Sequence, residues 1–127
     1  MTRTFAAAIN CIDGRTHVPV IEYLKSAFSV DFVDMITEPG VCKVLSENKD
    51  AAVLAALRSK LEISIQRHGS KFVAVAAHHD CAACSEGRQE QARALLAARE
   101  VVGSWGLGIK IVLLWIDEHG QATEVAG

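Results

Sequence analysis

The sequence predicts a three-layer α/β/α domain built on a mainly parallel sheet, and three observations support this prediction. Four apolar runs have the length and composition of buried strands. Amphipathic helical patterns lie between these runs. This alternation of strands with helices favours parallel strands that are joined by right-handed crossovers. We expect the strand order 2-1-3-4, with a short C-terminal edge strand added after the fourth strand.

The composition is that of an ordinary globular protein. The chain has 127 residues, of which 50% are hydrophobic and 22% are charged. We therefore expect a single domain over residues 1–127 and no extended disorder. The formal net charge of −2 provides no basic surface for nucleic acid or for an anionic membrane. No run reaches the ~18 apolar residues of a spanning helix, and the first residues do not have the features of a signal peptide. We therefore expect a cytoplasmic protein.

The expected strands are rich in uninterrupted apolar residues, which is typical of strands that are covered on both faces. They are Thr4–Ile12, Val30–Ile36, Lys71–Ala77 and Ile109–Ile116. The last two runs are almost continuously apolar, as in a parallel sheet between helices. A turn at residues 117–120 then leads to the short edge strand, Gln121–Val125.

Three helices are expected between the strands. They are Val18–Phe28, Asn48–His68 and Ser85–Trp105. Pro19 falls in the first turn of the first helix, where its missing N–H has no cost. In the second helix Leu57 and Leu61 belong to one apolar face, and Gly69 follows the last turn as a typical C-terminal cap. Ser85 is the expected N-cap of the third helix.

Two polar clusters follow the first and third expected strands. In the order 2-1-3-4 the strand order reverses between these two strands, and ligands bind beyond the carboxyl ends at such a point. Cys11 follows the first strand, whereas His78 and Cys81 follow the third. Two thiols and an imidazole are ligands that suit Zn²⁺, and three protein ligands leave a fourth position open, as in catalytic zinc sites.

These residues resemble the motifs of the β-class carbonic anhydrases, and the chain looks most like the short carbonic-anhydrase-like members of that superfamily. The motifs are Cys11-x-Asp13-x-Arg15 after a first strand and His78-x-x-Cys81 after a later parallel strand. The resemblance implies that Cys11, His78 and Cys81 bind zinc and that Asp13 and Arg15 form a dyad beside it. It also implies reversible hydration of carbon dioxide to bicarbonate by a metal-bound hydroxide, in a homodimer or higher homo-oligomer.

The family pattern gives the dyad a defined task. The Arg holds the Asp carboxylate away from zinc, and the Asp accepts a hydrogen bond from the zinc-bound water. The sequence departs from the pattern at Ala77 and Ala82, where the family has Gly. Because Ala is more restricted to negative φ, we expect the loop after the third strand to differ slightly. The chain begins at its first strand, so we also expect no counterpart of the N-terminal arm that lines the family's carbon dioxide pocket.

Two other functions remain open from the residues alone. A non-catalytic zinc-binding protein on the same fold would have a closed site, with Asp13 or Cys84 as the fourth ligand. A thiol redox protein would use Cys81-x-x-Cys84 between a strand and a helix. Neither Pro19 nor Pro39 precedes a later strand, where the thioredoxin-like fold places its cis-proline, so this alternative is the weaker one.

The sequence suggests roles for four further residues near the motifs. Asp80 is either a helix-start residue or a group that hydrogen-bonds to His78 and orients its ring as a metal ligand. Cys42 has no His nearby in the sequence and is expected to be structural. His17 and His79 are both candidates to carry a proton out of the site, because an unperturbed His titrates near pH ~6.5.

Overall fold

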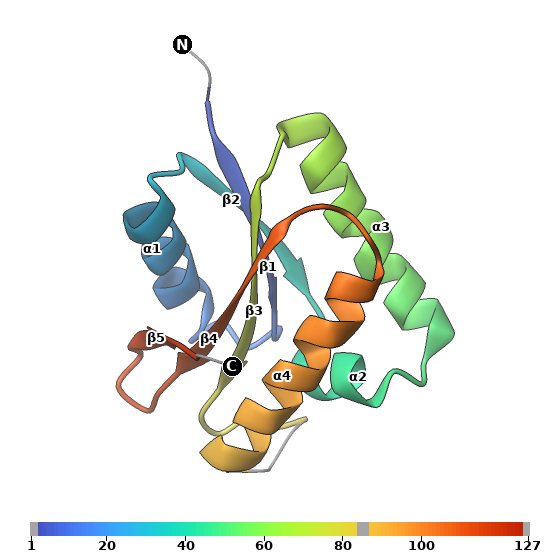
Figure 1. Cartoon of the computed structure of the whole chain (residues 1–127). Helices are drawn as coiled ribbons and strands as arrows, with labels where there is room; N and C mark the ends of the chain where they lie inside the picture. Colours follow the sequence, from blue (N-terminus) through green and yellow to red (C-terminus); the bar gives the residue numbers. More distant parts are fainter. Residues whose placement is uncertain (1–2, 84–86, 126–127) are drawn as a thin grey trace.

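The computed structural model describes residues 3–83 and 87–125, and within these ranges it contains five strands and four helices (Figure 1). The strands are β1 (Phe5–Asn10), β2 (Phe32–Thr37), β3 (Phe72–His78), β4 (Lys110–Ile116) and β5 (Ala122–Glu124). The helices are α1 (His17–Phe28), α2 (Val41–Glu47), α3 (Ala51–His68) and α4 (Arg88–Ser104). Among the described residues, no helix has the length and apolarity needed to cross a membrane.

The five strands form one sheet in the order β2-β1-β3-β4-β5. The first four are parallel, and β5 pairs antiparallel with β4. Ala8 lies opposite Met35 of β2 on one side and Ala74 of β3 on the other. The predicted α/β fold class, the order 2-1-3-4 and the short edge strand are confirmed. The carboxyl ends of β1 and β3 are therefore neighbours.

Helices cover both faces of the sheet, α1 on one face and the other three on the opposite face (Figure 1). Alternate residues of each strand divide between the two cores. Ala8 packs with Val20 and Leu24 of α1, whereas Ile9 packs with Leu57 of α3 and Leu95 of α4. Burial on both faces explains why the central strands are uninterrupted apolar runs.

Helix α2 is the main difference from the sequence prediction, which expected no helix between the second strand and Asn48. It has seven residues, and left-handed residues bound it on both sides, Gly40 before it and Asn48 after it. Such a short helix is unstable alone, and here tertiary packing stabilises it: Val41 and Leu45 are buried in the core. The following helix starts later than expected, at Ala51, behind the Asp50 N-cap.

The last helix also begins later than predicted. Helix α4 starts at Arg88, with Gly87 in the N-cap position. The proposed Ser85 cap and Cys84 lie outside the described residues. Its apolar stripe is as expected, because Leu95, Ala98 and Val102 are buried.

Candidate metal centre

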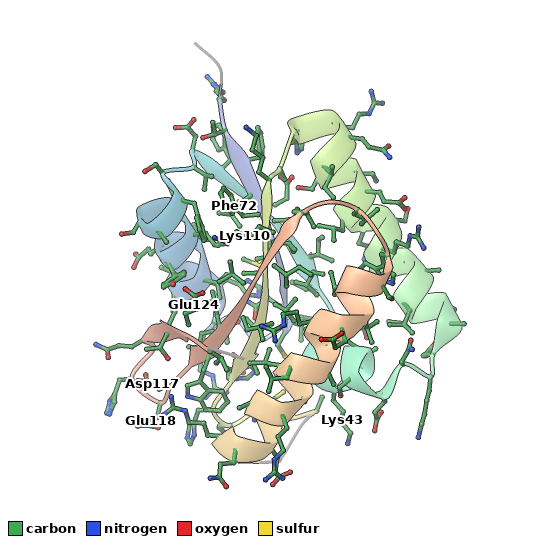
Figure 2. All side chains as sticks on the ribbon, in the orientation of Figure 1. Lys43, Phe72, Lys110, Asp117, Glu118 and Glu124 are labelled. Atoms are coloured by element: carbon green, nitrogen blue, oxygen red, sulfur yellow. The ribbon has the colours of Figure 1, made fainter. Side chains whose placement is uncertain are left out.

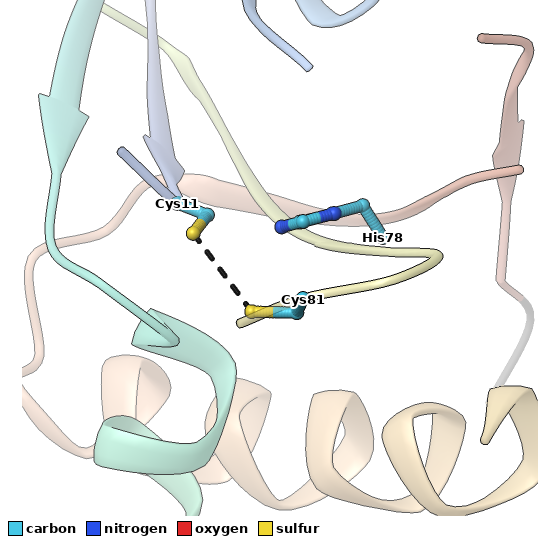
Figure 3. A group of neighbouring side chains, drawn as sticks. All are labelled: Cys11, His78 and Cys81. Carbon is cyan, nitrogen blue, oxygen red and sulfur yellow. Dashed lines mark hydrogen bonds between the residues drawn. The ribbon is translucent and has the colours of Figure 1, made fainter. Parts of the chain in front are cut away.

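The three residues with metal-ligand chemistry lie together at the carboxyl ends of β1 and β3 (Figure 3). Cys11 follows the last residue of β1, His78 ends β3, and Cys81 lies in the turn after it. Their ligand atoms all lie within 4.8 Å of one another, and all three residues are buried. The two Sγ atoms are 3.9 Å apart. The fold thus brings together residues that are 70 positions apart in the chain.

The His78 ring presents one unpaired nitrogen to this cluster. Nδ1 lies 2.8 Å from the backbone carbonyl oxygen of His79 and therefore carries the proton that it donates. Nε2 is buried and has no hydrogen-bond partner within the described part of the chain. A buried acceptor left unpaired costs free energy, and a cation would remove this cost. Two thiols and a free imidazole nitrogen form a donor set that fits Zn²⁺.

A buried polar network shapes the loop that carries Cys11. The Asn10 side-chain oxygen accepts a hydrogen bond from the Cys11 backbone N–H at 2.9 Å, and its Nδ2 donates to Thr16 Oγ1 at 2.9 Å. Thr16 Oγ1 donates in turn to the Asp13 carbonyl oxygen at 2.8 Å. Asn10 is 0% exposed and Thr16 is 1% exposed. Neither residue was predicted from the sequence, although an Asn at the end of an apolar strand was the available signal.

Asp13 and Arg15 form a bidentate ion pair beside the cluster. Arg15 Nε lies 3.0 Å from Oδ1 and Nη2 lies 2.6 Å from Oδ2 of Asp13. The Arg15 backbone N–H also donates to Oδ1 at 3.0 Å. These hydrogen bonds hold the pKa of Asp13 well below its usual range, with a further contribution from the positive charge of the Arg15 guanidinium. Asp13 is thus a fixed, ionised carboxylate that can only accept hydrogen bonds.

Arg15 also reaches Asp80, which corrects both sequence interpretations of that residue. Arg15 Nη2 donates to the Asp80 carbonyl oxygen at 3.1 Å, and Nη1 lies 3.4 Å from its Oδ2. Asp80 does not begin a helix, because α4 starts at Arg88. It does not orient His78 either, since the His79 carbonyl does so. Arg15 therefore ties the loop after β1 to the turn after β3.

Asp80, in the turn after β3, has a left-handed backbone conformation. Its φ of 58° lies in the left-handed region, which Asp tolerates better than most residues. Ala77 and Ala82, where the resembled family has Gly, are not among the described residues with positive φ. Alanine is therefore compatible with the backbone at both positions.

A family model described as putative carbonic anhydrase matches residues 1–126 of the chain. The protein belongs to this carbonic anhydrase family. The match spans almost the whole sequence and confirms the resemblance seen in the two motifs. No curated protein sequence matches the chain.

Solved carbonic anhydrases share the fold at low sequence identity. The β-carbonic anhydrase isoform I of Trichomonas vaginalis is 15% identical, with a TM-score of 0.63 over 99% of this chain and 85% of that one. The carbonic anhydrase of Glaciozyma antarctica is 16% identical, with a TM-score of 0.55 over 99% and 85%. A structure of tetrameric β-carbonic anhydrases of Sordaria macrospora is 13% identical, with a TM-score of 0.51 over 100% and 83%.

Two hollows of this carbonic anhydrase family member border His78. The larger has a volume of about 80 Å³ and the smaller about 10 Å³. The first has room for several water-sized molecules, whereas the second is near the lower limit for one. The larger is lined by Arg15, Thr16, His78, His79, Ile116, Asp117, Glu118 and Gly120. The smaller is lined by Cys11, Gly40, Val41, Cys42, Ala76, Ala77, His78, Cys81 and Gln91.

Gly40 closes the smaller hollow by close backbone packing. Its φ is +57°, and a Cβ built on it would lie 2.9 Å from the Cβ of Ala83. Glycine therefore allows the turn before α2 to approach the segment that follows Cys81. Gln91 of α4, which is 2% exposed, also lines this hollow and was not predicted from the sequence.

The other residues that the sequence analysis named lie outside the three-residue cluster or outside the described residues. Cys42 is buried on α2, and its Sγ donates to the Gln91 carbonyl oxygen at 3.7 Å, outside the three-residue cluster. His17 Nε2 lies 3.0 Å from the Cys11 carbonyl oxygen, whereas His79 is exposed near Glu118. Because Cys84 is outside the described residues, its suggested roles as a ligand or a redox partner stay predictions.

Proposed function

We propose that this protein binds one zinc ion through Cys11, His78 and Cys81 and catalyses the reversible hydration of carbon dioxide to bicarbonate. The observation that carries the proposal is the buried, unpaired Nε2 of His78 beside two thiol groups. Membership of the carbonic anhydrase family supports the reaction class. The donor set supports the metal, since sulfur and imidazole ligands are typical of zinc.

Zinc, when bound, lowers the pKa of water to about 7 and so makes hydroxide available near neutral pH. The chain's own residues supply position and charge. Asp13 accepts a hydrogen bond from the attacking water. This contact orients a lone pair of the water oxygen toward the carbon atom of carbon dioxide. Arg15 keeps Asp13 ionised and holds both of its oxygens. The hollow beside His78 receives the carbon dioxide, a molecule small enough for its volume of about 80 Å³.

Metal content is the experiment that tests the zinc site. Protein purified without a metal-affinity tag is expected to contain close to one zinc per chain by elemental analysis. Cys11→Ser removes a thiolate ligand and should weaken zinc affinity by about a hundredfold or more. Cys42→Ser is the matched control, because Cys42 is buried nearby but lies outside the cluster. It should retain the metal.

A stopped-flow assay of carbon dioxide hydration on the zinc-loaded protein tests the reaction. Activity that requires Cys11 and survives Cys42→Ser supports the proposal. A protein that holds zinc but does not hydrate carbon dioxide would instead be the non-catalytic zinc-binding alternative. Protein that neither contains nor takes up zinc, with thiols that all react freely, would overturn the zinc site itself.

We also propose that the protein forms a homodimer or a higher homo-oligomer. The Sordaria macrospora proteins with this fold are described as tetrameric. Strand β2 is an edge of the sheet here, and it carries Phe32 at 41% exposure. An exposed edge and a large apolar side chain favour association. Light scattering should give a mass of at least two chains, and a monomeric mass would contradict this assembly.

A cytoplasmic location is part of the same proposal. The proposed zinc site uses Cys11 and Cys81 as thiolate ligands. Thiols persist in a reducing compartment, where disulfides are rare. Fractionation of cells that express the native chain should recover it with the cytosol, and recovery outside the cell would contradict this location.

A further inference from the structure

A hollow larger than the two beside His78 lies at the opposite end of the sheet, where the strands begin. Its volume is about 450 Å³, which is within the range of small-molecule sites, about 300–1,000 Å³. Residues around the starts of β1 and β3, the end of α1 and the turn after α3 line it. Figure 2 shows Phe72 and Lys110 at this end of the molecule, far from Asp117 and Glu118 near the metal centre.

Aromatic rings form much of the lining of this hollow. Phe28 and Phe72 stack with their ring centroids 4.1 Å apart and an interplanar angle of 17°. Phe5 stacks on the His68 ring at 4.2 Å and 20°. All four residues line the hollow, and the three Phe side chains are only partly buried. Flat, partly exposed rings of this kind favour a planar ligand that can stack on them.

The same lining is cationic. Arg3 and Lys71 line the hollow together with His68, and the lining contains no Asp or Glu. Neither Arg3 nor Lys71 forms an ion pair in the described part of the chain. Lys110 adds a further positive charge, with its Nζ 5.8 Å from the centroid of the Phe28 ring. The chain as a whole has a net charge of −2, whereas Arg3 and Lys71 give this lining positive charge that attracts anions.

Two carboxylates, those of Asp31 and Asp34, hydrogen-bond to residues of this lining. Asp31 Oδ2 accepts a hydrogen bond from the backbone N–H of Thr4 at 2.9 Å. Asp34 Oδ2 accepts from Ser64 Oγ and from His68 Nδ1, each at 2.7 Å. The contact with Asp34 fixes the His68 ring and leaves its Nε2 without a hydrogen-bond partner among the described residues.

We propose that this hollow is a binding site for a small planar aromatic anion, of the aryl carboxylate or aryl sulfonate class. The Phe rings stack on the aromatic part of the ligand, and Arg3 and Lys71 pair with its negative charge. This site does not rest on the zinc proposal, because no residue of the metal cluster lines the hollow. Failure of one proposal therefore leaves the other standing.

Titration of the purified protein with benzoate, followed by ¹H–¹⁵N NMR, tests the proposal. We expect saturable shifts of the backbone amides of Gly69, Lys71 and Phe72. Benzyl alcohol keeps the ring without the charge, and acetate keeps the charge without the ring. Each should bind about tenfold or more weakly than benzoate, because each loses one of the two contributions.

Charge variants at the rim make the test specific. Lys71→Met should weaken benzoate binding roughly two- to five-fold, which is the effect of losing one partly exposed ion pair. Lys71→Glu should weaken it further. Lys49→Met, an exposed lysine between α2 and α3, should leave the affinity unchanged. Lys71 is exposed, so these variants should fold, and their NMR spectra verify this.

Three results would overturn the proposal. The first is the absence of saturable shifts at the amides of this hollow, including the case in which benzoate shifts only residues 116–120 beside the metal centre. The second is equal affinity for benzoate and benzyl alcohol. The third is unchanged benzoate affinity in the folded Lys71→Glu variant.

Discussion

The two ends of the sheet present different kinds of site on one scaffold. At the carboxyl end the candidate ligands are buried, and the loop that carries Cys11 is fixed by the buried side chains of Asn10 and Thr16. At the amino end a wide hollow is lined by rings and by exposed cations. The comparison shows that a metal site requires buried, oriented donor atoms, whereas a site for an organic anion can use exposed charge above apolar rings.

The charges at the two ends are also arranged differently. Arg15 is paired with Asp13 and Asp80 at the carboxyl end, so its guanidinium already has anionic partners, and Asp117 and Glu118 line the hollow there. Lys71 at the amino end has no such partner in the described ranges 3–83 and 87–125. An organic anion therefore suits the amino end.

The largest effect is expected from Asp13→Asn at the carboxyl end. Asn cannot form the ion pair with Arg15, and its amide can donate as well as accept, so the attacking water is no longer oriented. The rate of carbon dioxide hydration should fall by about 10²–10⁴-fold. Zinc content should remain near one per chain, since Cys11, His78 and Cys81 are unchanged. Stopped-flow kinetics and elemental analysis measure the two quantities on the same sample.

Asp50→Asn is the matched control for this variant. Asp50 caps α3 through its side chain, and Asn is an equally good cap, so both rate and stability should stay close to those of the native protein. A normal hydration rate in Asp13→Asn would remove Asp13 from the catalytic machinery. Benzoate affinity at the amino-end hollow should be the same in both variants, which tests the independence of the two ends.

The sequence predicted the sheet well because its strands carry a simple signal. Uninterrupted apolar runs such as 72–77 are explained by burial on both faces, and the parallel order follows from the helices between the strands. The meeting of Cys11, His78 and Cys81 followed from the same topology, since neighbouring parallel strands end at one edge.

The features that the sequence did not predict depend on tertiary contacts. Helix α2 is too short to have a clear periodicity, and the burial of Val41 and Leu45 stabilises it. The contact between Arg15 and Asp80 joins residues 65 positions apart, and no local pattern encodes it. The hollow at the amino end is assembled from four elements, β1, α1, α3 and β3, and from the residues before β1, so it has no sequence motif at all.

A smaller effect, on stability, is expected from Gly40→Ala. The left-handed φ of +57° is strained for Ala, and the new Cβ would meet Ala83 at 2.9 Å. Gly69→Ala is the control: φ is +69° there, but no atom lies within 4 Å of the new Cβ. We expect about 1–2 kcal/mol of destabilisation for Gly69→Ala and about 1–3 kcal/mol more for Gly40→Ala, measured by urea denaturation. Equal losses would show that the turn before α2 is not tightly packed on the segment after Cys81.

Asn10→Ala should destabilise the protein by about 2 kcal/mol. It leaves the buried Cys11 N–H without its acceptor and Thr16 Oγ1 without its donor. Thr16→Ser keeps the hydroxyl and should change the free energy of unfolding by much less. Denaturant titration measures both variants. A loss in Asn10→Ala no larger than that in Thr16→Ser would show that the network does not hold the loop.

The smallest effect is expected from Asp31→Asn at the amino end, and it depends on pH. Backbone and side-chain hydrogen bonds from Thr4 lower the pKa of Asp31 below its ordinary value of 3.8. The unfolded chain therefore binds more protons than the folded chain as the pH falls below about 4. The stability from these bonds is present above that pH and is lost as the pH falls through the folded pKa.

Asp31→Asn should therefore make the free energy of unfolding less dependent on pH between about pH 4 and pH 2. Some dependence should remain, because hydrogen bonds from Gln121 and His119 also lower the pKa of Asp117. Thr4→Val is the control. It removes the hydroxyl but keeps the Thr4 backbone N–H, the largest contribution to the shift, so most of the slope should persist. An unchanged slope in Asp31→Asn would show that the first residues of β1 are not tied to Asp31 in solution, and the Arg3 side of the amino-end hollow would then be less ordered than the metal centre.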